Sequence, residues 1–187
     1  MEFLEYDDVL SSARLIKEGT QEINEFITQY IEFSAEIMNS MLKTNLEYTG
    51  CEKIQSFERE LLVSQTLCDD RGANNVFIGL HMDTNTAAYL ADKYYELIAL
   101  QYNASKPERI SFTDIVDFCE ELLNTMDCPC TYRLSIDYTL RLPMHTRDAV
   151  CKAPQIYRLN FSENELEITI FVIFGKNYTI EGINDDQ

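Results

Sequence analysis

The length, composition and charge of the chain already exclude several classes of protein. It has 187 residues, of which 45% are hydrophobic, which is ordinary for one globular domain and too apolar for a disordered chain. Its 32 acidic and 15 basic side chains give a formal net charge of −17, and such a field repels the nucleic-acid backbone and anionic membrane surfaces. We therefore expect neither nucleic acid nor membrane among its partners.

The N-terminal segment and the cysteines predict a cytoplasmic location. Residues 1–19, MEFLEYDDVLSSARLIKEG, lack the basic start and the apolar block of a signal peptide. No segment of the sequence reaches the uninterrupted apolar length of a membrane span. The chain contains six cysteines, but a secreted disulfide framework would be shorter and carry a leader, so we expect reduced thiols.

The first half of the chain predicts a helix, two strands and a second helix. Apolar residues recur at helical spacing over 20–43, which predicts one long helix. The period then becomes strand-like over 53–67 and 75–82, and the turn-rich segment between these runs predicts an antiparallel pair. A second helix is expected over 84–102, with Asn85 or Thr86 as its cap.

The second half predicts a third helix followed by strands. The segment 103–107 is the clearest connector, and a helix is expected from Ser111 or Thr113 to about Met126. Pro129 should end or kink that helix, because proline removes a backbone donor and crowds the preceding turn. Strand-like alternation follows at 131–142, 154–161 and 165–174. A helix followed by antiparallel strands, twice over, predicts an α+β fold with long helices packed on an antiparallel sheet.

The two long helices at 20–43 and 113–126 contain an internal repeat. TQYIEFSAEIMNSM, beginning at Thr28, aligns without a gap with TDIVDFCEELLNTM, beginning at Thr113. Packing explains shared apolar positions but gives no reason for shared polar ones, so we infer a tandem duplication. The identical pairs are Thr28 and Thr113, Phe33 and Phe118, Glu36 and Glu121, Asn39 and Asn124, and Met41 and Met126.

The duplication predicts a domain organisation. Residues 20–182 form one domain of two pseudo-symmetric halves, about 20–107 and 108–182. An N-terminal extension at 1–19 precedes the domain, and a frayed tail at 183–187 follows it.

The repeated polar positions form one stripe on each helix. Residues spaced i, i+4 and i+7 lie on one helix face. An isolated Glu-x-x-Asn pair is best explained as a solvated helix face, but its recurrence in both halves favours a functional role. The stripes consist of Glu32, Glu36 and Asn39, and of Asp117, Glu121 and Asn124, the second extended upstream by Asp114.

These stripes resemble the signature of the CheC/CheX/FliY phosphatases of bacterial chemotaxis. That signature is an Asp or Ser, then ExxN one turn later on a long exposed helix, with a proline downstream. Asp117-x-x-x-Glu121-x-x-Asn124 fits it, and Glu32-x-x-x-Glu36-x-x-Asn39 fits it with Glu at the first position. The segment 78–90 is also similar to the family's strand leading into a helix. A doubled site resembles CheC more than CheX, and Pro143 is the downstream proline candidate.

The resemblance implies a CheC-like domain that hydrolyses the aspartyl phosphate of a CheY-like response-regulator receiver in two-component signalling. Such hydrolysis needs an in-line water, which the amide of Asn124, and also that of Asn39, would position. Glu121 and Glu36 would pair with the receiver's lysine and fix the register. The resemblance implies no cofactor of the chain's own, because the receiver supplies Mg²⁺. We expect Glu121 and Asn124 to be the working pair, since only this half has a proline partner.

Other interpretations remain open at this stage. The residues after each Asn lack the family's glycine, which favours a non-catalytic CheC-like module that docks a receiver or another chemotaxis or flagellar protein. A third interpretation is an acidic scaffold, which buried or internally paired Glu36 and Glu121 would support. Cys128 and Cys130 form one short pair rather than the two that structural zinc sites usually show, so zinc is disfavoured. The sequence leaves the oligomeric state open, and a homodimer is compatible with it.

Overall fold

The computed structural model describes the backbone of residues 21–69, 75–133, 138–140, 144–174 and 179–181. Side chains are described for 23–57, 61–67, 76–127 and 156–174. The predicted extension at 1–19, the predicted tail at 183–187 and Pro143 lie outside the described residues.

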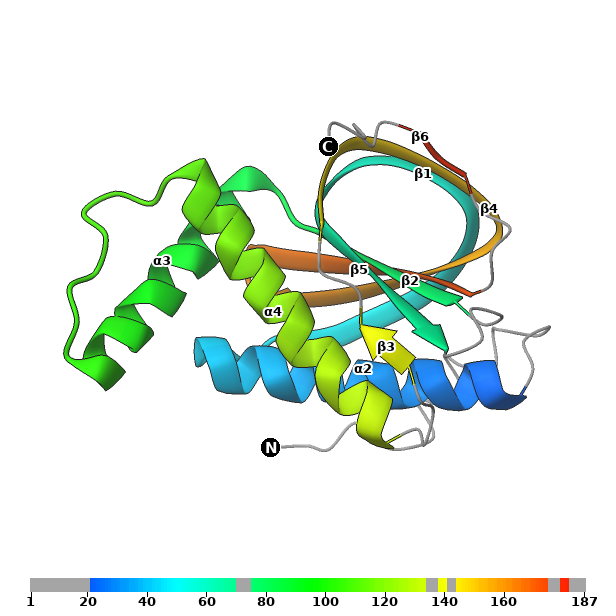
Figure 1. Ribbon diagram of the computed structural model, residues 1–187, viewed down its shortest axis with the longest axis horizontal. Helices are drawn as coiled ribbons and strands as arrows, with labels where there is room; N and C mark the ends of the chain where they lie inside the picture. The colour runs from blue at the N-terminus through cyan, green and yellow to red at the C-terminus, as the bar shows by residue number, and fades with distance from the viewer. Residues whose placement is uncertain (1–20, 70–74, 134–137, 141–143, 175–178, 182–187) are drawn as a thin grey trace.

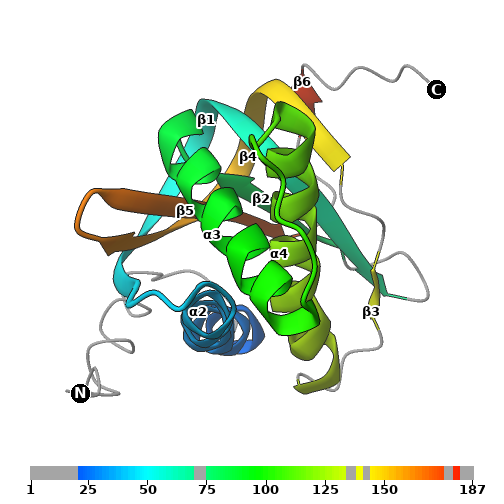
Figure 2. The ribbon, with the colours of Figure 1, turned by 90° about the vertical axis from the view of Figure 1, so that its left-hand side faces the viewer.

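The helices lie together on one side of the strands (Figures 1 and 2). α2 spans Gln21–Leu42, α3 spans Thr84–Tyr102 and α4 spans Phe112–Arg133. The expected helices at 20–43 and 84–102 are confirmed almost to the residue. α4 begins where the sequence predicts but extends further.

The strands form one antiparallel sheet that closes on itself. Its order is β3-β1-β2-β5-β4-β6, and β1 also pairs with β4, so the long strands β1 and β4 complete a ring with β2 and β5. Figure 1 shows β1 and β4 following the same tight curve. Register shifts along their pairing supply the bulges that bend paired strands. The strands are β1 Glu47–Asp69, β2 Asn75–His81, β3 Tyr138–Leu140, β4 Met144–Glu163, β5 Leu166–Phe174 and β6 Thr179–Glu181.

The order of elements repeats along the chain. α2 is followed by the long strand β1 and the shorter β2, and α4 is followed, after the short β3, by the long β4 and the shorter β5. Corresponding strands pair with each other in antiparallel fashion, β1 with β4 and β2 with β5, as a two-fold relation between the halves requires. The α+β class, with an antiparallel sheet packed against long helices, is confirmed. The predicted domain boundaries stay a prediction.

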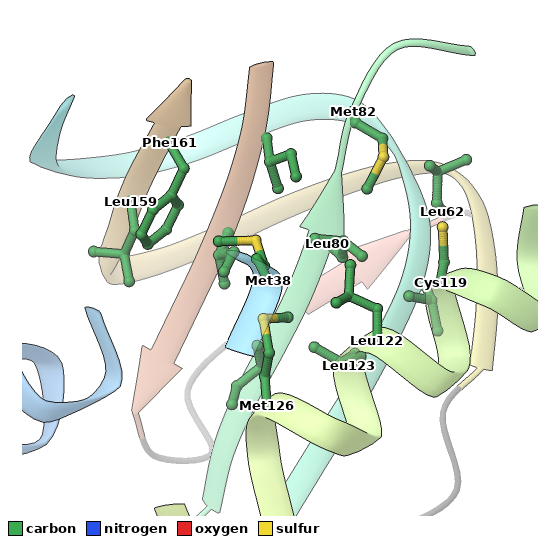
Figure 3. Close-up of a cluster of buried hydrophobic side chains, with 14 of the residues drawn as sticks. Met38, Leu62, Leu80, Met82, Cys119, Leu122, Leu123, Met126, Leu159 and Phe161 are labelled. Atoms are coloured by element: carbon green, nitrogen blue, oxygen red, sulfur yellow. The ribbon is translucent and has the colours of Figure 1, made fainter. Parts of the chain in front are cut away.

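Two hydrophobic clusters lie on opposite faces of the strands. The larger one fills the space between helices and sheet, and Figure 3 shows Leu122 and Met126 of α4 pointing toward Leu80 of β2. Successive residues of a strand face opposite sides, so Ile78 joins this cluster while Phe77 joins the other. The second cluster consists of Phe57, Leu61, Phe77, Ile156, Phe171 and Ile173.

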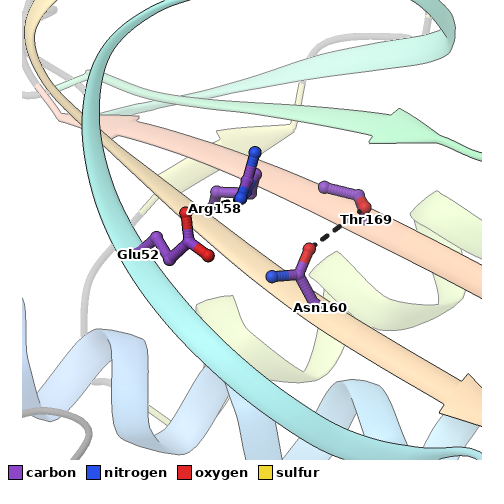
Figure 4. A network of polar contacts seen from close by, with 4 residues as sticks. All are labelled: Glu52, Arg158, Asn160 and Thr169. Atoms are coloured by element: carbon purple, nitrogen blue, oxygen red, sulfur yellow. Dashed lines mark hydrogen bonds and ion pairs between the residues drawn. The ribbon is translucent and has the colours of Figure 1, made fainter.

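Polar side chains pair across neighbouring strands at matching register positions of β1, β4 and β5. Glu52 of β1 forms an ion pair with its register partner Arg158 of β4. Thr169 of β5 donates a hydrogen bond from Oγ1 to Oδ1 of its register partner Asn160, at 3.2 Å (Figure 4). Each cross-strand pair of this kind stabilises the sheet by roughly 0.2–1 kcal/mol.

The structure corrects the predicted cap of α3. The cap is Asp83, and not Asn85 or Thr86. Oδ1 of Asp83 accepts the backbone N–H groups of Asn85 at 2.9 Å and Thr86 at 3.0 Å. These N–H groups begin the helix and have no partner within it, so the residue before the first turn is the one that can satisfy them.

The structure also corrects the end of α4. The helix continues through Pro129 to Arg133, so the first three residues of the expected strand over 131–142 are helical. Within that range 138–140 form β3, and β4 begins at Met144 rather than near residue 154. A proline inside a helix costs about 3 kcal/mol, but α4 packs against both α2 and β1. That packing outweighs the local preference to stop.

Candidate functional site

The polar stripe of α4 faces outward because the opposite face of the helix is in the core. Phe118, Leu122 and Met126 are fully buried. Asp117 and Glu121 are exposed, and Asn124, one turn beyond Glu121, is half-buried at the edge of the packed surface. The helical spacing therefore places these polar side chains as the sequence predicts.

The amide of Asn124 is held from below by a side chain of the sheet. Nε2 of Gln65 on β1 donates a hydrogen bond to Oδ1 of Asn124 at 2.9 Å. The amino group Nδ2 of Asn124 makes no hydrogen bond with any residue that the structure describes. The oxygen of this amide is anchored inward, and its amino group is left available to a partner.

The stripe of α2 has the same outward carboxylates. Glu32 and Glu36 are exposed, and Asn39 is half-buried. Glu36 and Glu121 are thus exposed, and their burial, which would have supported an acidic scaffold with a purely structural repeat, is not found.

The amide of Asn39, in contrast, is occupied by its own chain. Its Oδ1 accepts the backbone N–H of Leu46 at 2.7 Å and Oγ1 of Thr44 at 3.0 Å. Its Nδ2 donates to the carbonyl oxygen of Leu46 at 2.9 Å. These bonds use both acceptor positions and one of the two donors of the amide. They form because α2 ends at Leu42 and Lys43 adopts a left-handed conformation, φ 50°, that turns the chain back.

Two tyrosines of α3 lie beside the acidic stripe of α4. The rings of Tyr94 and Phe118 have centroids 5.4 Å apart. Burial raises the pKa of Tyr94, and the charge of Glu121 raises it further. The hydroxyl of Tyr95 donates to the carbonyl oxygen of Asp114 at 3.3 Å. Burial and then the charges of Asp114 and Asp117 raise the pKa of Tyr95, so both phenols stay protonated at neutral pH.

Asp114 has a structural task at the start of α4. Its carboxylate accepts the backbone N–H of Ser111 at 2.7 Å and Oγ of Ser111 at 2.6 Å. Its own backbone N–H donates to Oγ of Ser111 at 3.2 Å. This is the reciprocal arrangement of a capping box, and the hydrogen bonds from Ser111 lower the pKa of Asp114.

A buried carboxyl lies one turn beyond Asn124. Asp127 is fully buried and accepts the hydroxyl of Tyr30 at 2.7 Å on Oδ1, which joins α4 to α2. Burial raises the pKa of Asp127 to about 8, and the hydrogen bond from Tyr30 partly offsets that rise. The carboxyl is therefore mainly protonated at neutral pH.

Sequence reasoning missed Gln65, Tyr94, Tyr95 and Asp127. Gln65 has a signal, because it is a polar residue in the strand segment LLVSQTL, whose same-face neighbours Val63 and Leu67 are core residues. No local pattern links the tyrosines of α3 to α4.

The described side chains bring together no group of three or more His, Cys, Asp or Glu residues that could hold a metal ion. Cys128 and Cys130 lie outside the described side chains. No helix among the described residues is long and apolar enough to cross a membrane.

The fold is similar to solved structures of chemotaxis proteins. A CheC-like superfamily protein from Shewanella sp. PV-4 has a TM-score of 0.64 and 14% identity, covering 84% of this chain and 100% of that one. CheX from Vibrio vulnificus has a TM-score of 0.60 and 13% identity, covering 80% and 99%. The CheX–CheY–BeF3–Mg²⁺ complex from Borrelia burgdorferi has a TM-score of 0.51 and 14% identity, covering 81% and 98%.

No family model matches the sequence, and no curated protein matches it either. The class defined by the fold is an α+β chain whose sheet closes on itself beneath long helices. More specifically, the chain has the fold of the CheC/CheX-type chemotaxis proteins, which is the fold that the resemblance in the sequence implies.

Proposed function

We propose that this chain is a cytoplasmic chemotaxis phosphatase that hydrolyses the aspartyl phosphate of a CheY-like receiver domain. Glu121 and Asn124 form its working pair. The observation that supports this most directly is the Asn124 amide, held by Gln65 with its amino group available, one turn from an exposed carboxylate. The same fold occurs in the Borrelia burgdorferi CheX that was solved with CheY, BeF3 and Mg²⁺.

Asn124 would position the attacking water. Nδ2–H donates to one lone pair of the water, which leaves another lone pair aimed in line at phosphorus. The new P–O bond forms as the bond to the aspartyl oxygen breaks, and the products are inorganic phosphate and the free Asp carboxylate of the receiver. The Mg²⁺ of the receiver neutralises the phosphoryl oxygens, so the phosphatase needs no metal and no general base of its own.

Glu121 would orient the complex. Its carboxylate is exposed one turn before Asn124. It would pair with the lysine beside the receiver's phosphorylation site and so fix the register of α4 on the receiver. The net charge of −17 steers positively charged surfaces toward the chain. Asp117 lies one turn before Glu121 on the same helix face, and Tyr94 lies close enough for the charge of Glu121 to raise its pKa.

The α2 stripe has the carboxylates of such a site without an available amide. The hydrogen bonds between Asn39 and the residues Thr44 and Leu46 support a binding role for this face and not a catalytic one. The alternative function is therefore a non-catalytic module that docks a receiver, or another chemotaxis or flagellar protein, without hydrolysis.

Decay of a CheY-type receiver phosphorylated with acetyl phosphate tests the proposal. The wild type should accelerate the decay, and Asn124→Ala should reduce that acceleration by about 100-fold, as loss of a positioned hydrogen-bond donor does in other enzymes. Glu121→Gln should raise KM or lower kcat, while the matched change Glu36→Gln on α2 should have little effect on either.

Two results would contradict this function. An unchanged rate in the double variant Asn39→Ala plus Asn124→Ala would show that the mechanism is wrong. A pull-down that recovers the BeF3-loaded receiver, together with no accelerated decay for the wild type, would establish the docking module instead.

A further inference from the structure

We propose that Gln65 is the positioning residue of this site, and that it determines which end of the Asn124 amide faces the receiver. This inference rests on the proposed function. Gln65 would touch neither the water nor the phosphoryl group and would act only through Asn124, 59 positions away in the sequence.

The position of Gln65 is otherwise apolar. It lies in β1, paired with Ile78 of β2, on the strand face that Val63 and Leu67 contribute to the main core. Only 2% of its surface is exposed. Burying an amide there costs free energy that an apolar side chain would not. Its hydrogen bond to Asn124 offsets part of that cost and explains why a polar residue occupies this position.

The hydrogen bond acts on the orientation of the Asn124 amide. The side-chain torsion of Asn next to the amide is broad, so an unrestrained amide can present either its oxygen or its amino group. Gln65 Nε2 is a donor and therefore selects the state with Oδ1 inward and Nδ2 outward. Asn39 shows the opposite use of the same residue type, because backbone groups on both ends of its amide fix it to the loop.

The Gln65→Leu change removes the donor while keeping the size of the side chain. We expect kcat for decay of the acetyl-phosphate-labelled receiver to fall about tenfold or more, because a misplaced catalytic group loses its alignment. KM should stay near the wild-type value. Adding Gln65→Leu to Asn124→Ala should cause no further loss, because both changes remove one function. Ser64→Ala is the matched control, a neighbouring buried polar residue of β1 whose replacement should leave kcat unchanged.

The Gln65→Glu change tests the direction of the hydrogen bond. An ionised Glu only accepts, so it would turn Nδ2 of Asn124 inward and its oxygen outward, whereas a protonated Glu donates to Oδ1 as Gln65 does. Burial raises the pKa of a carboxyl. The ratio of the kcat of this variant to that of the wild type should therefore rise as the pH is lowered from 9 to 6. Taking the ratio cancels the titration of Asp127, which lies one turn beyond Asn124 in both proteins.

The variants distinguish a failure of the role proposed for Gln65 from a failure of the proposed phosphatase function. If Asn124→Ala is inactive while Gln65→Leu and Gln65→Glu keep wild-type kcat at every pH, the role of Gln65 is refuted and the phosphatase stands. If Asn124→Ala keeps the wild-type rate, the proposed function itself fails. If Gln65→Leu does not fold, as thermal unfolding would show, the pH profile of the isosteric Gln65→Glu decides the question.

Discussion

α2 and α4 carry the same sequence motif and use it differently. Asn39 and Asn124 occupy equivalent positions, each three residues beyond an exposed Glu. α2 ends three residues after Asn39, so the chain returns and its backbone binds the amide. α4 continues nine residues beyond Asn124, so the chain directly after this amide is helical and does not turn back, and Gln65 of β1 binds the amide instead. Whether the amide is available thus depends on where each helix ends.

The halves also differ directly beneath these amides. In the gapless alignment Leu42 corresponds to Asp127, and both are fully buried. The first half therefore closes its helix with an apolar contact, while the second half has a carboxyl that binds Tyr30 of the other helix. Because only the second half has this contact, replacing Asp127 is the most direct test of how the two halves differ.

The largest expected effect is on the pH dependence of stability through Asp127. Its pKa is raised from 3.8 to about 8 in the folded state, so the folded chain binds this proton more tightly than the unfolded chain. The stability due to the proton is fully present below pH 3.8 and is lost as pH rises to about 8. Between these values the slope is at most about 1.4 kcal/mol per pH unit.

Asp127→Asn removes this titration and keeps an acceptor for Tyr30. Denaturant unfolding at several pH values between 5 and 9 should show the variant gaining stability relative to the wild type as pH rises. Taking the difference between the two proteins cancels the pH-dependent repulsion among the other acidic groups. A difference that is constant with pH would show that Asp127 does not carry a raised pKa.

The next largest effect is a difference between Asn39 and Asn124 in their contribution to the free energy of unfolding. Asn39→Ala should lower the free energy of unfolding by about 2 kcal/mol, because the N–H and C=O groups of Leu46 lose their partners in a largely buried place. Asn124→Ala should cost less, about 1 kcal/mol, since it takes the partner from one buried donor, Nε2 of Gln65, where Asn39→Ala takes it from two backbone groups. Denaturant titration of both variants measures this. Equal losses would contradict the structural role assigned to Asn39.

The sequence predicts the elements that depend on local periodicity and misses those that depend on distant contacts. The spans of α2 and α3, the β1–β2 pair and the exposure of Glu36 and Glu121 follow from apolar spacing. The continuation of α4 through Pro129 does not, because packing overrides a local rule. The contact of Gln65 with Asn124 and the pairing of β1 with β4 join distant segments, and no local pattern specifies them.

The smallest expected effect concerns α3, which contacts both of the regions compared above, α2 and α4. Lys93 Nζ donates to the carbonyl oxygen of Lys43 after α2, and Tyr95 donates to Asp114 of α4. Weakening the cap of α3 therefore changes stability without removing a group from either stripe. Asp83→Ala should lower the free energy of unfolding by about 1 kcal/mol at neutral pH.

The pH dependence of this last change has the opposite sign to that of Asp127. The hydrogen bonds from Thr86, first through its side chain and then through its backbone, lower the pKa of Asp83 below 3.8. The stabilisation is thus present above pH 3.8 and is lost as pH falls through the folded pKa. Asp83→Asn, which keeps an acceptor for the first N–H groups, should lose less than Asp83→Ala. If Asp83→Ala left stability unchanged at pH 7, the cap would contribute nothing to the stability of the fold.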